Sequence, residues 1–158
     1  MKFSKLCAAA AASAAAAALL LCGCGGNVVK VTNDDGSANY VMTVDADVTE
    51  LDEQTTLYDY MCALRETGEL TFEAELGEYG YFIVSVEGVE NTAESATSGY
   101  AWTIYTDLSE LDGVIYSDAS YDTWEYDGRQ LASANYGISG LPAVEGYTYA
   151  LVYSHYSY

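Results

Sequence analysis

One segment of this 158-residue chain has the period of a helix, whereas the segments around it have the composition of strands. The helical segment runs from about Thr56 to Thr67, and Gly68 supplies a stop after it. Thr56 and Asp59 have the spacing of a capping box. The apolar stripe consists of Leu57, Tyr60, Met61 and Leu64. Because a lone amphipathic helix needs a partner for that stripe, we expect an α+β fold, a small and mostly antiparallel β-sheet domain with this helix packed on one face.

Strands are expected where tyrosine, valine and threonine are dense. These segments are 40–44, 81–87, 100–106 and 147–153. Turn signals follow or separate them at Asp112-Gly113, Asp127-Gly128 and Glu145-Gly146. We therefore expect one domain with a single core.

The N-terminus has the pattern of an export signal, with two lysines followed by an alanine-rich apolar run. The run ends in Leu-Cys-Gly-Cys, which resembles a bacterial lipobox. Cys24 fits the lipidated position because the small Gly23 precedes it, whereas Leu21 fits poorly before Cys22. We expect residues 1–23 to be a lipoprotein signal peptide and Cys24 to anchor the protein to the membrane, on the outer side of the bacterial cell surface. The alternative is a plain signal peptide that is cut nearby.

The remaining chain divides into a tether and a domain. Residues 24–38 are rich in Gly, Asn, Asp and Ser, with one Val-Val-Lys-Val interruption, and are expected to form a flexible tether. Residues 39–158 form the expected domain. With Cys24 lipidated, Cys62 is the one thiol left after the signal, so an internal disulfide is excluded and the core must hold the fold.

The mature chain is strongly acidic. All 24 acidic residues follow the signal, whereas only Lys30, Arg65 and Arg129 of the basic residues do, which gives a net charge near −21. Such a surface repels nucleic acid and anionic lipid headgroups. We therefore expect no nucleic-acid partner and a solvated acidic surface.

No catalytic motif is present. No Gly-x-Ser-x-Gly signals a Ser nucleophile, and a catalytic triad would have to use His155, the sole histidine. We expect a protein that is not an enzyme and that has no metal and no cofactor. Calcium at Asp45–Glu50, or at the looser cluster of Asp118, Asp122 and Asp127, is left open as an alternative to solvated turns.

Aromatic residues remain as the candidate binding surface. Within a strand, alternate residues share a face, so Tyr81 is separated from Phe82 and Val84, while Tyr100 and Trp102 lie together. We expect Phe82 and Val84 to enter the core and Tyr81 to stand on the other side. The helix covers one face, so rings left bare on the other would form a platform for a planar ligand, a sugar or a protein. The aromatic residues concerned are Tyr79, Tyr81, Phe82, Tyr100, Trp102, Tyr105, Trp124 and Tyr126.

The order of five short pieces resembles the transcobalamin-like C-terminal domain family, over most of the mature chain. The pieces are Thr55–Tyr60, Tyr79–Phe82, Ser85–Gly88, Tyr100–Tyr105, and Gly137-Ile138 followed by Glu145-Gly146-Tyr147. The resemblance implies a small β-rich domain with one helix, like the C-terminal β-domain of cobalamin carriers.

The resemblance also implies a ligand, a corrinoid such as cobalamin. The implied contacts are Trp102, Thr103 and Ile104, with Tyr81 and Phe82 as weaker candidates. Two features depart from the family. No helical barrel precedes the domain, and residues 107–134 are longer than the family's connection and could cover the same face.

Three functional hypotheses follow. The first is a non-enzymatic, lipid-anchored surface protein that captures a ligand, with a corrinoid as the implied ligand, near a membrane transporter. The second is a protein- or glycan-interaction module of the cell envelope. The third is a hydrolase that uses His155 and a carboxylate.

Overall fold

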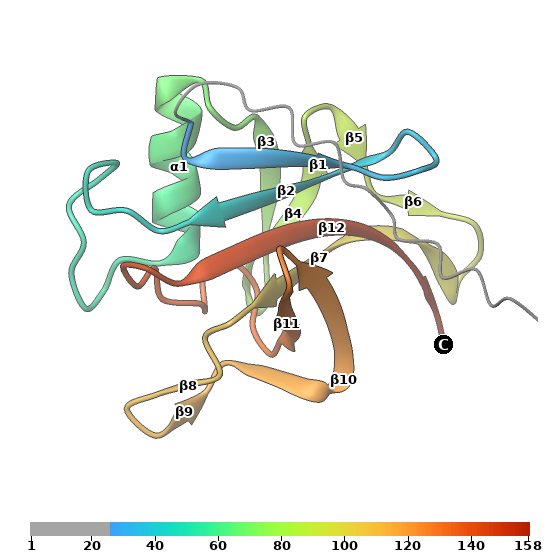
Figure 1. The fold of residues 1–158 in the computed structure, drawn as a ribbon. Helices are drawn as coiled ribbons and strands as arrows, with labels where there is room; N and C mark the ends of the chain where they lie inside the picture. The colour runs from blue at the N-terminus through green and yellow to red at the C-terminus, as the bar shows by residue number, and fades with distance from the viewer. Residues whose placement is uncertain (1–25) are drawn as a thin grey trace, which may run out of the picture.

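The computed structural model describes residues 26–158 (Figure 1), which form one helix and mostly antiparallel strands. The α+β expectation is therefore confirmed in outline. The central sheet has the strand order β1-β2-β12-β7-β11-β10, with β6 beside β7. A smaller sheet contains β3, β4 and β5, and β8 pairs with β9. The elements are β1 (Val28–Thr32), β2 (Ala38–Thr43), α1 (Leu57–Thr67), β3 (Phe72–Gly77), β4 (Gly80–Val86), β5 (Val89–Glu90), β6 (Thr92–Ala93), β7 (Ser98–Thr106), β8 (Glu110–Leu111), β9 (Val114–Ile115), β10 (Ser117–Tyr126), β11 (Arg129–Ala134) and β12 (Thr148–Ser157).

Helix α1 begins and ends where its caps predict. The Thr56 N–H donates to the Asp59 carboxylate at 2.9 Å, and the Asp59 N–H donates to the Thr56 hydroxyl at 3.3 Å. These two bonds form the capping box. Gly68 ends the helix in the left-handed region, with φ of 79°. The four residues of the predicted stripe are all buried.

The flexible tether expected at 24–38 is wrong where the chain is described. Val28–Thr32 form β1 and pair with β2, with Val29 opposite Val41. The polar residues after β1 form the hairpin turn, in which the Asn33 N–H donates to the Ser37 carbonyl at 2.8 Å. Turns and tethers share a Gly- and Asp-rich composition, which is why the two are hard to separate in sequence. The expected signal peptide, residues 1–23, and the expected lipidated Cys24 lie outside the described residues.

The main core lies between the central sheet and a second layer behind it, which contains α1 and the β3-β4-β5 sheet (Figure 1). Met42, Tyr149 and Leu151 project from the central sheet into this core and are fully buried. The helix contributes its apolar stripe, and β4 contributes Ile83 and Val86. This face therefore has two covering elements rather than the helix alone.

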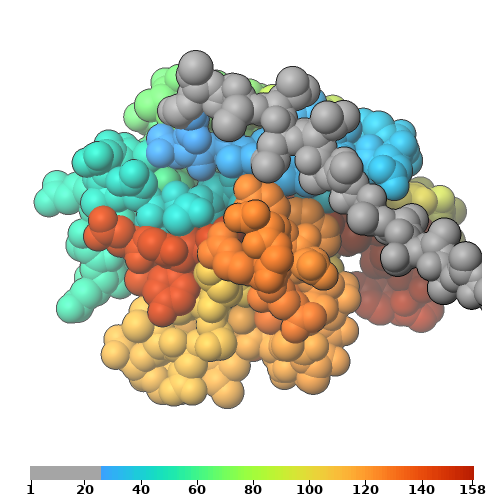
Figure 2. Space-filling view, in the orientation of Figure 1, coloured from blue at the N-terminus to red at the C-terminus, as the bar shows by residue number. Residues whose placement is uncertain are grey.

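A second core covers the opposite face of the sheet. The β10–β11 hairpin folds over that face, where its Leu131 is fully buried against Val41, Tyr105 and Val152. In Figure 2 this segment, in orange, lies in front, and β12, in red, emerges on both sides of it. The bare face expected opposite the helix is therefore wrong, and residues 107–134 supply the cover. The described part of the chain holds no helix long and apolar enough to span a bilayer.

Candidate functional site

Trp102, the centre of the expected ligand surface, is a core residue. Its side chain is 8% exposed and lies between the rings of Tyr40 and Tyr153, at centroid distances of 5.9 and 5.1 Å. The indole Nε1–H donates to the Val89 carbonyl at 2.8 Å. The Trp102 backbone N–H donates to the Asn91 side chain at 3.0 Å. The chain around β5 therefore covers this indole, and no ligand can reach its face.

The other four expected contacts do not form one surface. Ile104 is buried, while Thr103 faces the opposite side of the sheet and shares a 2.9 Å hydrogen bond with Ser154. Phe82 is 48% exposed on the outer face of β4. Tyr81 is half-buried against the helix.

The expected orientation of β4 is reversed. Ile83, which is 5% exposed, takes the core position, so the alternating Phe82 points outward. Tyr81 lies on the core side of β4 and stacks on Tyr58 of the helix, with ring centroids 4.2 Å apart. The Tyr81 N–H donates to the Ser139 hydroxyl at 2.9 Å. Helix packing therefore decides which face of β4 is inside.

An exposed aromatic site surrounds Tyr100, which lies two residues before Trp102 on the same face of β7. We call it the aromatic end, and it consists of Tyr100, Tyr153 and His155. Tyr100 is 38% exposed and stacks on Tyr153 with a centroid distance of 5.6 Å and an interplanar angle of 21°. His155 meets the Tyr100 ring edge-on at 5.0 Å. The alternation that pairs Tyr100 with Trp102 was visible in sequence, but the cover over Trp102 was not.

Hydrogen bonds hold the aromatic end in place. The Tyr153 hydroxyl donates to the Glu90 carbonyl at 2.8 Å. The His155 Nε2 lies 3.1 Å from a Glu94 carboxylate oxygen. Beyond Tyr153 the rings continue through Trp102 to the buried Tyr40. Exposed rings on such a support are pre-organised for contact with a flat or apolar group.

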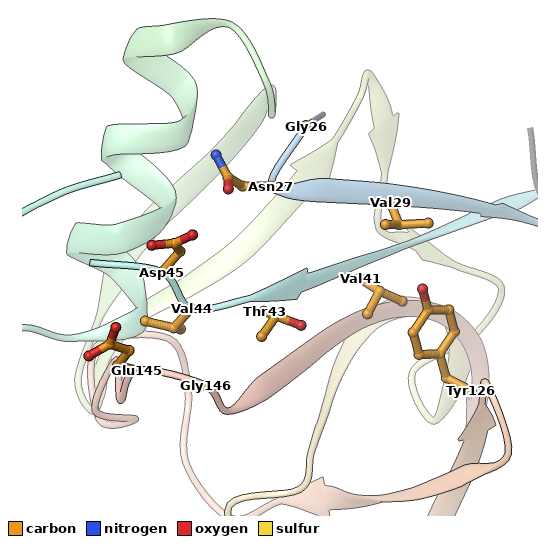
Figure 3. A pocket seen from close by; sticks show the side chains of 10 residues that line it. All are labelled: Gly26, Asn27, Val29, Val41, Thr43, Val44, Asp45, Tyr126, Glu145 and Gly146. Carbon is orange, nitrogen blue, oxygen red and sulfur yellow. The ribbon is translucent and has the colours of Figure 1, made fainter. Parts of the chain in front are cut away.

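A cavity of about 410 Å³ lies at the other end of the central sheet (Figure 3). Asp45 and Glu145 stand at one end of it and Tyr126 at the other, with Val29 and Val41 between them. No basic side chain lines this cavity. Its two carboxylates give it a negative charge, which favours cations.

The buried tyrosines have raised pKa values. Burial raises the pKa of Tyr105, and its 2.6 Å hydrogen bond to the Asp122 carboxylate raises it further. Burial also raises the pKa of Tyr149, whose hydroxyl donates to the Pro142 carbonyl at 2.5 Å. Both phenols are therefore neutral donors at physiological pH.

The carboxylates considered for calcium have local partners. The backbone N–H of Ser120 donates to Asp118 at 2.8 Å, and this bond lowers the pKa of Asp118. Asp122 accepts from Tyr105, and Asp45 accepts from the Asp47 N–H at 2.9 Å. Within residues 26–158, no three His, Cys, Asp or Glu side chains are placed to hold a metal ion.

The aromatic end and the cavity beside Asp45 are two places where the described chain could meet a ligand, and another hollow of about 350 Å³ lies beside Asp52, Leu111 and Pro142. Comparison with family models, curated proteins and solved structures finds no match to this chain.

Proposed function

We propose that this protein is a non-enzymatic, lipid-anchored module of the bacterial cell envelope that binds a partner protein at its aromatic end. The observation that carries the proposal is the exposed Tyr100 ring, which is held between Tyr153 and His155 on a hydrogen-bonded support. Exposed aromatic side chains on a rigid frame are typical anchors of protein–protein interfaces.

A protein partner fits this site better than a corrinoid. Capture of a corrinoid rests on open rings around Trp102, and that indole is buried. Small-ligand sites bury about 70–90% of their ligand. The aromatic end is a surface rather than a pocket, so it offers no such enclosure. Membership of the transcobalamin-like C-terminal domain family remains a proposal that rests on the five sequence pieces.

A glycan also fits less well. Sugar sites need polar groups that are free to bond hydroxyls around the ring. At the aromatic end, the Glu94 carboxylate is paired with His155 and the Tyr153 hydroxyl is bonded to Glu90. A sugar hydroxyl would have to share the Glu94 carboxylate with His155. The Tyr153 hydroxyl already donates its proton to Glu90, whereas the rings remain available.

The anchoring part of the proposal rests on the lipobox-like sequence at Cys24. Metabolic labelling with a palmitate analogue, followed by purification, tests it. We expect label on the mature protein and none on Cys24→Ser, which should also leave the membrane fraction. Label retained by Cys24→Ser would overturn the assignment.

The partner proposal is tested by photo-crosslinking on intact cells. A photoreactive phenylalanine analogue replaces Tyr100 in one strain and Tyr121, an exposed tyrosine on β10, in a control strain. We expect an adduct of defined mass from position 100 and none from position 121. Absence of an adduct at position 100, or equal adducts at both positions, would reject the proposal.

A further inference from the structure

Strand β12 has an open edge beside the aromatic end. It pairs with β7 from Tyr149 to Ser157 but with β2 only from Thr148 to Leu151. Beyond Leu151, therefore, the side of β12 that faces β2 has no neighbouring strand within the described residues. Figure 1 shows this half of β12 extending past β2 toward the C-terminus.

The backbone groups on that edge can be assigned from the hydrogen-bond pattern. Residues of an antiparallel strand direct their N–H and C=O groups alternately to one side and the other. The Val44 N–H donates to the Tyr147 carbonyl, so odd-numbered residues of β12 face β2. The Asp107 N–H donates to the Thr148 carbonyl, so even-numbered residues face β7.

His155 and Ser157 therefore direct their backbone groups to the open side. Tyr153 does so as well, but its N–H is already bonded to the Asn39 side chain at 3.1 Å. Neither strand pairing nor a described hydrogen bond uses the N–H of His155 or of Ser157. The edge thus offers a repeat of donors and acceptors that an added strand would match.

The other long edge strands of the described chain carry features that hinder the addition of a further strand, whereas this edge carries none of them. β10 has a register shift between Asp118 and Thr123, and β3 carries the charged residues Glu73 and Glu75. β1 carries Lys30. Bulges and edge lysines are the usual devices against strand addition. Residues 153–157 contain no bulge, no proline and no lysine.

The charge around this edge is negative. Asn39, which bonds Tyr153, also donates to Asn33 at 3.2 Å, so the Asp34–Asp35 turn lies at the start of the edge. Glu94 lies against His155. A second copy of the mature chain, with 24 acidic and three basic residues, would bring another net charge near −21 to the contact. Charge therefore favours a basic occupant over self-pairing.

We propose that the open edge of β12, residues 153–157, adds an extended basic segment of the partner protein as a further strand. This inference rests on the proposed function and names the mode of binding. Alternate side chains of the added strand fall on the face that carries the aromatic end, while the backbone pairs with His155 and Ser157. Backbone hydrogen bonds between the added strand and β12 supply the affinity. Contacts with the rings of the aromatic end select which side chains the added strand can carry.

The test uses the mature domain and synthetic peptides that alternate lysine with valine, with glutamate–valine peptides as the charge control. Amide hydrogen exchange followed by NMR is the direct readout. We expect the lysine peptide to slow exchange at His155 and Ser157 and the glutamate peptide to leave it unchanged. Binding without protection at these two amides, or equal effects of the two peptides, would overturn the proposal.

Two proline variants provide the matched comparison. Ser157→Pro removes an outward N–H while keeping the ladder with β7, and Thr32→Pro removes an outward N–H from the β1 edge. We expect Ser157→Pro to weaken peptide binding about tenfold and Thr32→Pro to change it less than about twofold. Equal affinity of the two variants would refute strand addition at β12.

The same variants separate this inference from the proposed function. If Ser157→Pro still gives the adduct from position 100, the partner binds the aromatic end and strand addition is wrong. If no adduct forms in any strain, the proposed function fails, whatever the peptides do. A dimer in sedimentation that Ser157→Pro abolishes would make a second copy the occupant and overturn the basic-partner assignment.

Discussion

Tyr105 of the second core donates one hydrogen bond to a carboxylate, that of Asp122. Its ring is buried against Leu131 and Val152, and its hydroxyl donates to Asp122 of β10. Burial and this bond raise the pKa of Tyr105 in the folded protein. The unfolded chain has an ordinary tyrosine pKa near 10. The resulting stability is fully present below about pH 10 and is lost as the pH rises toward the folded pKa.

We therefore predict that the melting temperature falls steeply above about pH 10 and that Tyr105→Phe makes this fall shallower. The variant should lose roughly 1 kcal/mol at neutral pH, because Asp122 loses its donor. Tyr121→Phe is the control, since Tyr121 is 79% exposed. Thermal melts followed by circular dichroism across the alkaline range are the measurement. Parallel pH profiles for Tyr105→Phe and the wild type would contradict the assignment.

The burial of Trp102 gives a second prediction at the same scale. Its Nε1–H is bonded to Val89, and its ring is enclosed by Tyr40 and Tyr153. In the Trp124→Phe background, Trp102 is the sole tryptophan. We expect cobalamin to leave its emission unchanged after correction for absorption, with free N-acetyltryptophanamide as the reference. Saturable quenching would restore the corrinoid hypothesis.

The helix could be predicted from the sequence more accurately than some of the strands. Helix α1 was predicted to within a residue because its caps and its stripe are local signals. Strand β1 was missed because its pairing with β2 is not local, and its flanking residues suit a tether as well as a turn. The exposed ring of the candidate site could not be chosen from sequence either. Tyr100 is exposed and Trp102 is buried because the chain at Val89, whose carbonyl accepts the Trp102 Nε1–H, covers the indole.

The β10–β11 hairpin is the element whose role needs a direct test. If it closes the second core, Leu131→Ala should destabilise the protein by roughly 2–5 kcal/mol, because this side chain is fully buried. Tyr121→Ala on the same hairpin should cost less than about 0.5 kcal/mol. Urea unfolding followed by circular dichroism would measure both. A small effect of Leu131→Ala would mean that the hairpin does not stabilise the sheet.

At the scale of the whole molecule, the described fold begins a few residues after the proposed anchor, Cys24. Asn27 is already fixed, since its N–H donates to Glu69 at 2.6 Å, and β1 begins at Val28. Three residues separate Cys24 from Val28, and the four Cα–Cα steps between them span at most about 14 Å. If Cys24 is lipidated, the domain therefore lies against the membrane surface, and its acidic surface keeps it from anionic headgroups.

This geometry predicts resistance to protease on intact cells. The described chain folds from Asn27 onward, so little extended chain is left for a protease to cut between lipid and domain. A Gly/Ser insertion of about fifteen residues after Gly26 would add roughly 20 Å of flexible chain. We expect a broad-specificity protease to release the domain from cells that carry the insertion and to leave the unmodified protein attached. We expect soluble Cys24→Ser protein, digested in parallel, to survive as a folded domain, which is the control for cleavage within the domain. Release of both anchored forms at the same rate would mean that the domain stands away from the membrane, as a long tether would hold it.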